Sequence, residues 1–210
     1  NINLDIKSKN IHVIMGLSGS GKSTLIRHVN RLIEPTSGKI IVDGKNMLDM
    51  SDEELREFRR FKASMVFQKF ALLPHRTVIK NVAYGLLIQG VKKGEAYERS
   101  QKWIDKVSLN GYENNYPYQL SGGMQQRVGL ARAMATDAGI LLMDEAFSSL
   151  DPLIRSSMQE ILLDLQKELN KTIIFITHDL NEALRIGDQI SILRDGEIIQ
   201  TGSPEDILLG

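Results

Sequence analysis

A short stretch near the beginning of the chain has the residue types and spacing needed to hold a polyphosphate. Residues 16–24 read Gly-Leu-Ser-Gly-Ser-Gly-Lys-Ser-Thr and fit the phosphate-loop pattern G-x-x-x-x-G-K-[ST]. Glycines let the backbone close round phosphates without Cβ clashes, so that N–H groups point at them. Lys22 can reach the β- and γ-phosphates, and the Ser23 hydroxyl suits Mg²⁺, which prefers oxygen ligands. The predicted contact residues are Gly16, Ser18, Gly19, Ser20, Gly21, Lys22, Ser23 and Thr24.

Two carboxylates follow a second apolar segment. Residues 140–143 read Ile-Leu-Leu-Met, which is typical of a parallel strand buried on both faces, and Asp144 and Glu145 come directly after it. Ligands bind at the carboxyl ends of such strands. Opposite a phosphate loop, Asp144 is expected to hold Mg²⁺ through water, and Glu145 is the candidate general base for an attacking water. The alternative is a pair of acidic residues that only caps the following turn.

A second glycine motif lies far along the chain. Residues 120–127 read Leu-Ser-Gly-Gly-Met-Gln-Gln-Arg and open a helix, so they form another anion-binding helix N-terminus. One nucleotide does not need two phosphate-binding motifs in one chain. The second motif makes sense if it serves a nucleotide bound to another copy in a two-fold, head-to-tail pair. Local composition alone favours an ordinary capped helix.

The elements that position these motifs alternate between strands and helices. Residues 72–126 contain no convincing strand and indicate a helical insertion in an otherwise α/β chain. Two antiparallel pairs of strands are joined by Asp-Gly turns. The expected strands are 2–6, 11–15, 39–42, 45–48, 64–67, 140–143, 172–177, 189–193 and 197–200. The expected helices are one with apolar spacing from Leu25 to Ile33, then 51–61, 78–88, 94–107, one opened by the second glycine motif, 152–169, 180–185 and a short one from Pro204.

Composition excludes several classes of protein. The chain has 210 residues with Lys+Arg and Asp+Glu both 26, so no global field favours nucleic acid or anionic lipid. Cysteine is absent, which excludes disulfides and thiolate metal sites. No apolar run approaches the roughly 18 residues that span a bilayer, and the start does not resemble a signal peptide. We expect a soluble protein that begins at Asn1 because it is a piece of a longer chain.

The order of the motifs identifies a family. The phosphate loop, Gln68 after a strand, residues 120–127, Asp144-Glu145, residues 149–151 (Ser-Leu-Asp) and His178 together resemble the nucleotide-binding domain of an ABC ATPase. The fold implied is an α/β P-loop NTPase. Residues 1–71 and 127–210 would form a core with an antiparallel β-subdomain, and residues 72–126 an inserted helical subdomain.

The resemblance also implies roles for individual residues. Ser121 and Gly123, with Gly122 between them, would contact the γ-phosphate of the partner copy's ATP, and Asp151 would lie at the dimer seam. Gln68 would ligate Mg²⁺ or water, together with Ser23 and Asp144. His178 would contact the γ-phosphate and orient water with Glu145, although a lone histidine after a strand is more often structural. Lys22, Glu145 and His178 are therefore the predicted catalytic residues, with ATP and Mg²⁺ as ligands.

Three further segments narrow the resemblance. Residues 30–38, 65–75 and 143–155 resemble ATPase subunits of importers for glycine betaine, proline betaine and related quaternary amines. The implied protein is a homodimer on the cytoplasmic face of the cell membrane. It would act with permease subunits and, indirectly, an extracellular substrate-binding protein, and without nucleic acid. The alternatives are an importer for another solute such as an amino acid, a soluble non-transport ABC ATPase, and a regulatory module that binds nucleotide without turnover.

The sequence departs from the family pattern at three places. The first aromatic residue is Phe58, so the aromatic residue that stacks on adenine is expected before Asn1. Regulatory domains of the cystathionine-synthase type, which such importer ATPases often carry at the C-terminus, are absent from this chain. Ser149 stands where family members commonly have alanine, a small change that we expect the dimer seam to tolerate.

Overall fold

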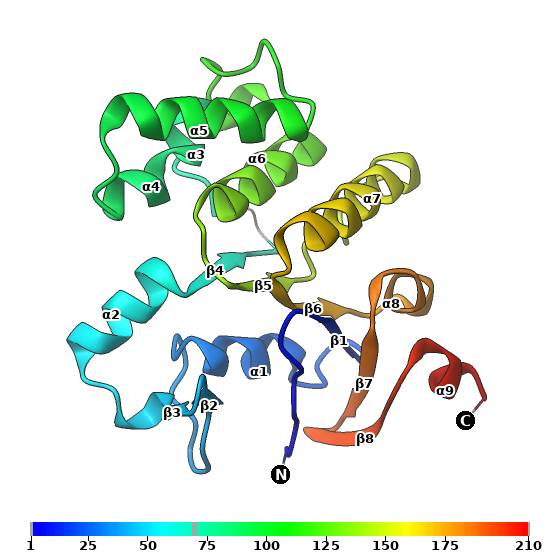
Figure 1. Cartoon of the computed structure of the whole chain (residues 1–210). Coiled ribbons are helices and arrows are strands. Elements are labelled where there is room, and N and C mark those ends of the chain that lie inside the picture. Colours follow the sequence, from blue (N-terminus) through cyan, green and yellow to red (C-terminus); the bar gives the residue numbers. More distant parts are fainter. Residues whose placement is uncertain (1, 69–70, 210) are drawn as a thin grey trace.

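A six-stranded sheet forms the centre of the chain (Figure 1). The computed structural model describes residues 2–68 and 71–209. In that part of the chain the first five strands in the sheet order are parallel, and the last pairs antiparallel with its neighbour. The order is β4 (Ala63–Val66), β5 (Ile140–Asp144), β6 (Thr172–Thr177), β1 (Ile11–Met15), β7 (Gln189–Arg194) and β8 (Glu197–Gly202). The strands predicted in these regions are confirmed, with no end displaced by more than two residues.

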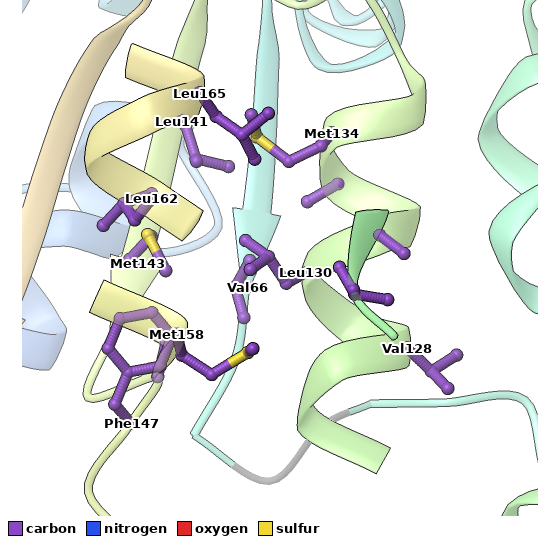
Figure 2. Close-up of a cluster of buried hydrophobic side chains, with 14 of the residues drawn as sticks. Val66, Val128, Leu130, Met134, Leu141, Met143, Phe147, Met158, Leu162 and Leu165 are labelled. Carbon is purple, nitrogen blue, oxygen red and sulfur yellow. The ribbon is translucent and has the colours of Figure 1, made fainter. Parts of the chain in front are cut away.

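The apolar strands are continuous because both faces of the sheet are covered. Along β5, Leu141 and Met143 point into one hydrophobic cluster and Leu142 into another. Figure 2 shows Leu141 and Met143 beside apolar side chains of α6 (Gly122–Ala135) and α7 (Pro152–Leu169). α8 (Leu180–Ile186) adds buried side chains to the same cluster. Successive side chains of a strand point to opposite faces of the sheet, so one apolar run contributes to two hydrophobic clusters.

The opposite face packs against α1 (Lys22–Val29), whose Ile26 is fully buried beside Leu142. The helix is shorter than the apolar spacing predicts. It ends at Asn30, and Arg31 has a left-handed φ of 49°. The Arg31 guanidinium donates to the carbonyls of Met47 and Met50, which fixes the turn. Leu32 and Ile33 are consequently exposed and do not extend the helical stripe.

A small antiparallel hairpin lies beside α2 (Asp52–Phe61), and its strands are shorter than predicted. β2 is Ile41–Val42 and β3 is Lys45–Asn46, joined by a turn with positive φ at Asp43 and Gly44. The chain leaves β3 because the Asn46 side chain accepts from the backbone of Leu48, which starts the 3₁₀ turn Met47–Asp49. The predicted capping box of α2, Ser51 with Glu54, is present.

The prediction of a strand at residues 2–6 is wrong. The structure assigns no strand to this segment. Its alternation has another cause, since Ile2, Leu4 and Ile6 pack against the α1-side cluster while the residues between them are exposed. An extended segment that is buried on one side has apolar residues at every second position even where it forms no strand hydrogen bonds with a neighbour.

The segment between β4 and β5 is helical, as predicted. It contains α3 (Val78–Val82), α4 (Tyr84–Ile88), α5 (Lys93–Lys106), the 3₁₀ turn Pro117–Gln119 and α6. The single helix expected at 78–88 is interrupted at Ala83, where ψ is −13°. After this break, α4 lies so close to the end of α6 that a Cβ on Gly85 would be 2.6 Å from the Thr136 side chain. α6 runs unbroken across residue 126, and its buried residues share one cluster with the sheet. The division at 72 and 126 stays a prediction.

The chain ends with β8 and α9 (Pro204–Leu209), which lie together beside β7 (Figure 1). The predicted turn between β7 and β8 has positive φ at Asp195 and Gly196. Among the residues that the structure describes, no helix combines the length and the apolar character that crossing a bilayer requires.

Candidate functional site

The site lies at the edge where the parallel strands β4, β5, β6 and β1 end. β1 is followed by the phosphate loop, β4 by Gln68, and β6 by His178, whereas β5 ends in Asp144 and leads into Glu145. Because these strands are parallel neighbours, their carboxyl ends meet at one edge of the sheet. The topology therefore brings together residues, some of which are separated by more than 160 positions in the sequence.

The phosphate loop has the backbone geometry that its glycines predict. Gly19 and Gly21 have φ of 84° and 98°, which other residues rarely adopt. Gly16 fits for a different reason, because a Cβ there would lie 2.2 Å from the Leu193 carbonyl oxygen. The Ser20 hydroxyl is buried and has no hydrogen-bond partner among the residues that the structure describes. A loop with a free buried hydroxyl and a helix N-terminus fits an incoming phosphate.

Lys22 is the first residue of α1 and is buried within the loop. Its Nζ donates to the carbonyl oxygens of Gly16 at 2.8 Å and Leu17 at 2.9 Å, and lies 3.7 Å from Glu145 Oε1. The ammonium group is thereby held between the loop and the end of β5. The other predicted contact residues of the loop differ in accessibility: Ser18 and Thr24 are exposed, while Ser23 is half-buried.

Asp144 is fully buried, and both of its carboxylate oxygens have partners from α1. The Ser23 hydroxyl donates to Oδ1 at 2.7 Å, and Arg27 donates to Oδ2 at 3.0 Å. Arg27 was missed by the sequence reasoning. The available signal was its position four residues after Ser23, which places both side chains on the same face of a helix.

Glu145 is the point where the predicted catalytic side chains meet. Its φ is 46°, and this left-handed backbone turns the side chain out of the strand direction. Gln68 Nε2 donates to Glu145 Oε2 at 3.0 Å, and His178 Nδ1 lies 3.6 Å from the same oxygen. With Lys22 near Oε1, three side chains from β1, β4 and β6 connections surround one carboxylate. A carboxylate so placed can accept a proton or orient a water.

The residues present fit a magnesium ion that is held partly by phosphate. Ser23, Asp144 and Gln68 offer hydroxyl, carboxylate and amide oxygens, and Mg²⁺ favours oxygen ligands. Within the described residues, no cluster of three or more His, Cys, Asp or Glu side chains forms a closed metal site. An open set with one buried carboxylate is what a metal–nucleotide complex needs, because the phosphates complete the shell.

The second glycine motif is not brought to the phosphate loop. Ser121 is the N-cap of α6 and accepts from the Met124 N–H at 3.3 Å, and both Ser121 and Gly122 are exposed. Gly123 is half-buried, and a Cβ there would lie 3.2 Å from Leu150. α6 and α1 cover opposite faces of the sheet (Figure 1). In the described residues, no hydrogen bond or ion pair joins this motif to residues 16–24.

Asp151 lies outside the cluster of catalytic side chains as well. It is the exposed N-cap of α7 and accepts from the Ile154 N–H at 3.1 Å. The structure thus places Lys22, Ser23, Gln68, Asp144, Glu145 and His178 together, and leaves Ser121, Gly122, Gly123 and Asp151 at the surface of the same chain.

Comparisons with known proteins agree with this geometry. A family model described as ABC transporter matches residues 1–148. The chain is 63% identical over 199 residues to the glycine betaine transport ATP-binding protein OpuAA of Bacillus subtilis (strain 168), covering 95% of this chain and 48% of that protein. It is also 63% identical over 203 residues to the glycine betaine/carnitine transport ATP-binding protein GbuA of Listeria monocytogenes serotype 1/2a (strain 10403S), covering 97% and 51%.

A solved structure shares the whole fold. The dimeric structure of a post-hydrolysis state of the ATP-binding cassette MJ0796, bound to ADP and Pi, superposes with a TM-score of 0.91 at 36% sequence identity. The match covers 97% of this chain and 89% of that chain. The chain spans about half the length of the curated relatives it matches.

Proposed function

Because the chain belongs to the ABC transporter family and has the ABC ATPase fold, we propose that it is the ATP-hydrolysing part of an importer for glycine betaine or a related quaternary amine. The observation that carries the hydrolytic part is the set of three side chains round Glu145. A carboxylate beside Gln68, Lys22 and His178 is arranged for in-line attack of water on a terminal phosphate.

The residues divide the chemistry among them. Glu145 orients the attacking water and accepts its proton, while His178 and Lys22 stabilise the negative charge that develops on the transferred phosphoryl group. Ser23, Asp144 and Gln68 would hold Mg²⁺, which neutralises charge on the phosphate oxygens when bound. Arg27 keeps the buried Asp144 carboxylate in place beside Ser23.

We propose that two copies share each nucleotide. Ser121, Gly122 and Gly123 of one copy would bind the γ-phosphate of ATP held in the phosphate loop of the other, with Asp151 at the seam. Support comes from the exposure of this motif, its distance from its own loop, and the dimeric cassette MJ0796. Residues 72–126 would move as a helical lobe against the core. A permease bound near that lobe would convert the motion into uptake at the cytoplasmic face of a membrane.

The transported solute is proposed from the relatives alone. OpuAA and GbuA carry names for glycine betaine and glycine betaine/carnitine transport, and no residue of the ATPase site described above identifies a solute. The test is uptake of labelled glycine betaine, carnitine and an amino acid by cells that express the full-length protein with its permease. Uptake of an amino acid without a quaternary amine would contradict the proposed solute class.

The hydrolytic function is tested by steady-state phosphate release. Glu145→Gln keeps the shape of the side chain and removes the proton acceptor, so turnover should fall by about a thousandfold. Glu160→Gln is the matched control, since Glu160 is an exposed carboxylate that pairs with Arg185, at the end of α8 away from His178, and is not among the predicted site residues. Phosphate release by Glu145→Gln at the rate of the control would refute the assigned role. A wild-type protein that binds ATP without releasing phosphate would favour the regulatory module.

A further inference from the structure

An arginine outside the nucleotide contacts connects the two loops that carry the predicted general base and the predicted γ-phosphate ligand. Arg155 is in the first turns of α7. Its Nη2 donates to the carbonyl oxygens of Ser148 at 3.4 Å and Leu150 at 3.2 Å, and its Nη1 donates to Asp179 Oδ2 at 3.2 Å. One guanidinium therefore reaches the turn after β5 and the loop after β6.

The first of these partners is tied directly to Glu145. Ser148 returns to the Glu145 carbonyl oxygen through its backbone N–H at 3.2 Å and its hydroxyl at 2.9 Å. Leu150 closes the next turn on Phe147, which is buried against Phe175. A displacement of the carbonyls that Arg155 holds would thus be transmitted to the backbone of Glu145, which already has a strained positive φ.

The second partner fixes the residue after His178. Asp179 is the N-cap of α8, and its Oδ1 accepts from the backbone of Asn181 and Glu182. Its own N–H donates to Thr177 Oγ1 at 3.0 Å. Both neighbours of His178 are therefore immobilised, while the imidazole itself remains exposed at the site. The carboxylate oxygen of Asp179 that does not cap the helix is the one that faces Arg155.

Behind this loop is a buried polar network that gives it a rigid base. Glu182 is buried; it accepts from Gln159 Nε2 of α7 at 3.0 Å and from the Thr177 hydroxyl. Groups of this kind are rigid when all members have partners. α7 thus holds the His178 loop at two points, through Gln159 in the interior and through Arg155 at the rim.

We propose that Arg155 is a positioning residue that sets the distance between Glu145 and His178, which is 3.6 Å from Oε2 to Nδ1 in this structure. The inference rests on the proposed function, because it assigns to Arg155 the alignment of that reaction and no contact with nucleotide. A misplacement of about 1 Å between reacting groups can reduce a rate about a hundredfold.

The chain offers a matched control for this role. Arg185 of α8 also bridges α7 and α8, since it donates to the Ser156 hydroxyl at 2.8 Å and pairs with Glu160 at 2.9 Å. Within the described part of the chain it has no hydrogen bond or ion pair with either of the two loops. If Arg155 affected turnover only by holding α7 and α8 together, Arg155→Gln and Arg185→Gln would change kcat to the same extent.

The experiment compares Arg155→Gln, Arg155→Lys, Asp179→Asn and Arg185→Gln by phosphate release and by NMR of the His178 imidazole. Asp179→Asn keeps the N-cap and removes only the charge, because Asn caps helices as well as Asp. We expect Arg155→Gln and Asp179→Asn to lower kcat by about tenfold to a hundredfold with KM for ATP within about twofold. Arg155→Lys should recover part of the rate, and Arg185→Gln should match wild type.

The combined variant and the spectrum separate positioning from simple stability. Arg155→Gln with Asp179→Asn should be no slower than the worse single variant, since the two changes break one contact. The His178 signals, distinguishable among four histidines, should shift in Arg155→Gln and not in Arg185→Gln. An unchanged kcat and unchanged His178 signals in both Arg155→Gln and Asp179→Asn would overturn the inference. Absence of turnover in wild type would instead refute the proposed function, while the spectra would still decide whether Arg155 positions His178.

Discussion

The chain contains two glycine motifs at helix N-termini, and they have opposite surroundings. Residues 16–24 lie among side chains from three other strand ends, with Lys22 buried and bonded. Residues 120–127 begin a capped helix on the other face of the sheet, with Ser121 and Gly122 exposed. The first motif is thus organised by its own chain. The second has no hydrogen bond or ion pair to the first among the described residues, which agrees with the proposal that it binds nucleotide held by another copy.

The largest effect is expected from a substitution in residues 16–24, the glycine motif whose contacts lie within its own chain. Lys22→Ala removes the cation between the loop carbonyls and Glu145, so binding of ATP by a single copy should weaken by about a hundredfold or more. Isothermal titration with ATP measures this, and Lys167→Ala on the exposed side of α7 is the control. Equal affinity of the two variants would remove Lys22 from the site.

A bulky change in the second motif should affect turnover and not binding. Ser121→Arg fills the space in front of α6, so phosphate release should fall by about a hundredfold while a single copy binds ATP within about twofold of wild type. The matched control is Ser51→Arg, which removes the N-cap of α2 and should cost similar stability, about 1 kcal/mol. Weakened ATP binding by monomeric Ser121→Arg would show that this motif acts within its own chain.

A smaller effect concerns the ion pair that supports the first motif. Arg27→Gln removes the charged partner of the fully buried Asp144 and leaves the Ser23 hydroxyl in place. The free energy of unfolding should fall by about 1–2 kcal/mol; because Arg27 is 39% exposed, the loss is less than for a fully buried pair. Urea denaturation without nucleotide measures it. Lys45→Gln, which breaks the exposed pair with Glu54, should leave the free energy of unfolding close to that of wild type. Equal losses of stability in the two variants would mean that the Arg27–Asp144 pair contributes no more than an exposed ion pair.

The smallest effect is a pH dependence centred on the strand that carries the phosphate loop. Burial lowers the pKa of His12 in β1 to about 4, and its Nε2 lies 2.8 Å from the Ser191 hydroxyl. Below pH 6.5 the unfolded chain takes up a proton that the folded chain refuses until about pH 4, so stability is full above pH 6.5 and falls as the pH decreases. The loss between pH 6.5 and 5.5 should be about 1 kcal/mol.

Urea titrations at these two pH values test the histidine directly. His12→Asn should flatten the pH dependence relative to wild type, and the exposed His75→Asn should not. α6, which carries the second glycine motif, contains no histidine and should contribute no such slope. An unchanged slope in His12→Asn would contradict the assignment.

The sequence predicts the phosphate-loop half of the site well because local rules and parallel topology agree there. Apolar runs followed by Asp144-Glu145 and by His178 place these residues at strand ends, and parallel strands bring their ends together. The bounds of α7 and β6 match the prediction residue for residue. The Glu145 cluster is thus largely a consequence of patterns that are visible along the chain.

The rest could not be predicted for identifiable reasons. Arg27 and Arg155 make contacts across 117 and 24 residues, and their local sequence does not show which distant carboxylate each of them meets. The strand expected at 2–6 follows a period of two that comes from one-sided burial. The break at Ala83 accompanies a close approach of α4 to the end of α6, at Gly85 and Thr136, which are far apart in the sequence. The role proposed for Ser121 depends on a second molecule.

The central claim is that ATP joins two copies through the second glycine motif. Light scattering of Glu145→Gln with saturating Mg·ATP tests it most directly, because this variant should retain the nucleotide that joins the copies. The account predicts a mass of about twice the 23.6 kDa of one chain, and a single-chain mass when Ser121→Arg is added to the same variant. A single-chain mass for Glu145→Gln under saturating ATP, or a dimer that persists with Ser121→Arg, would contradict it.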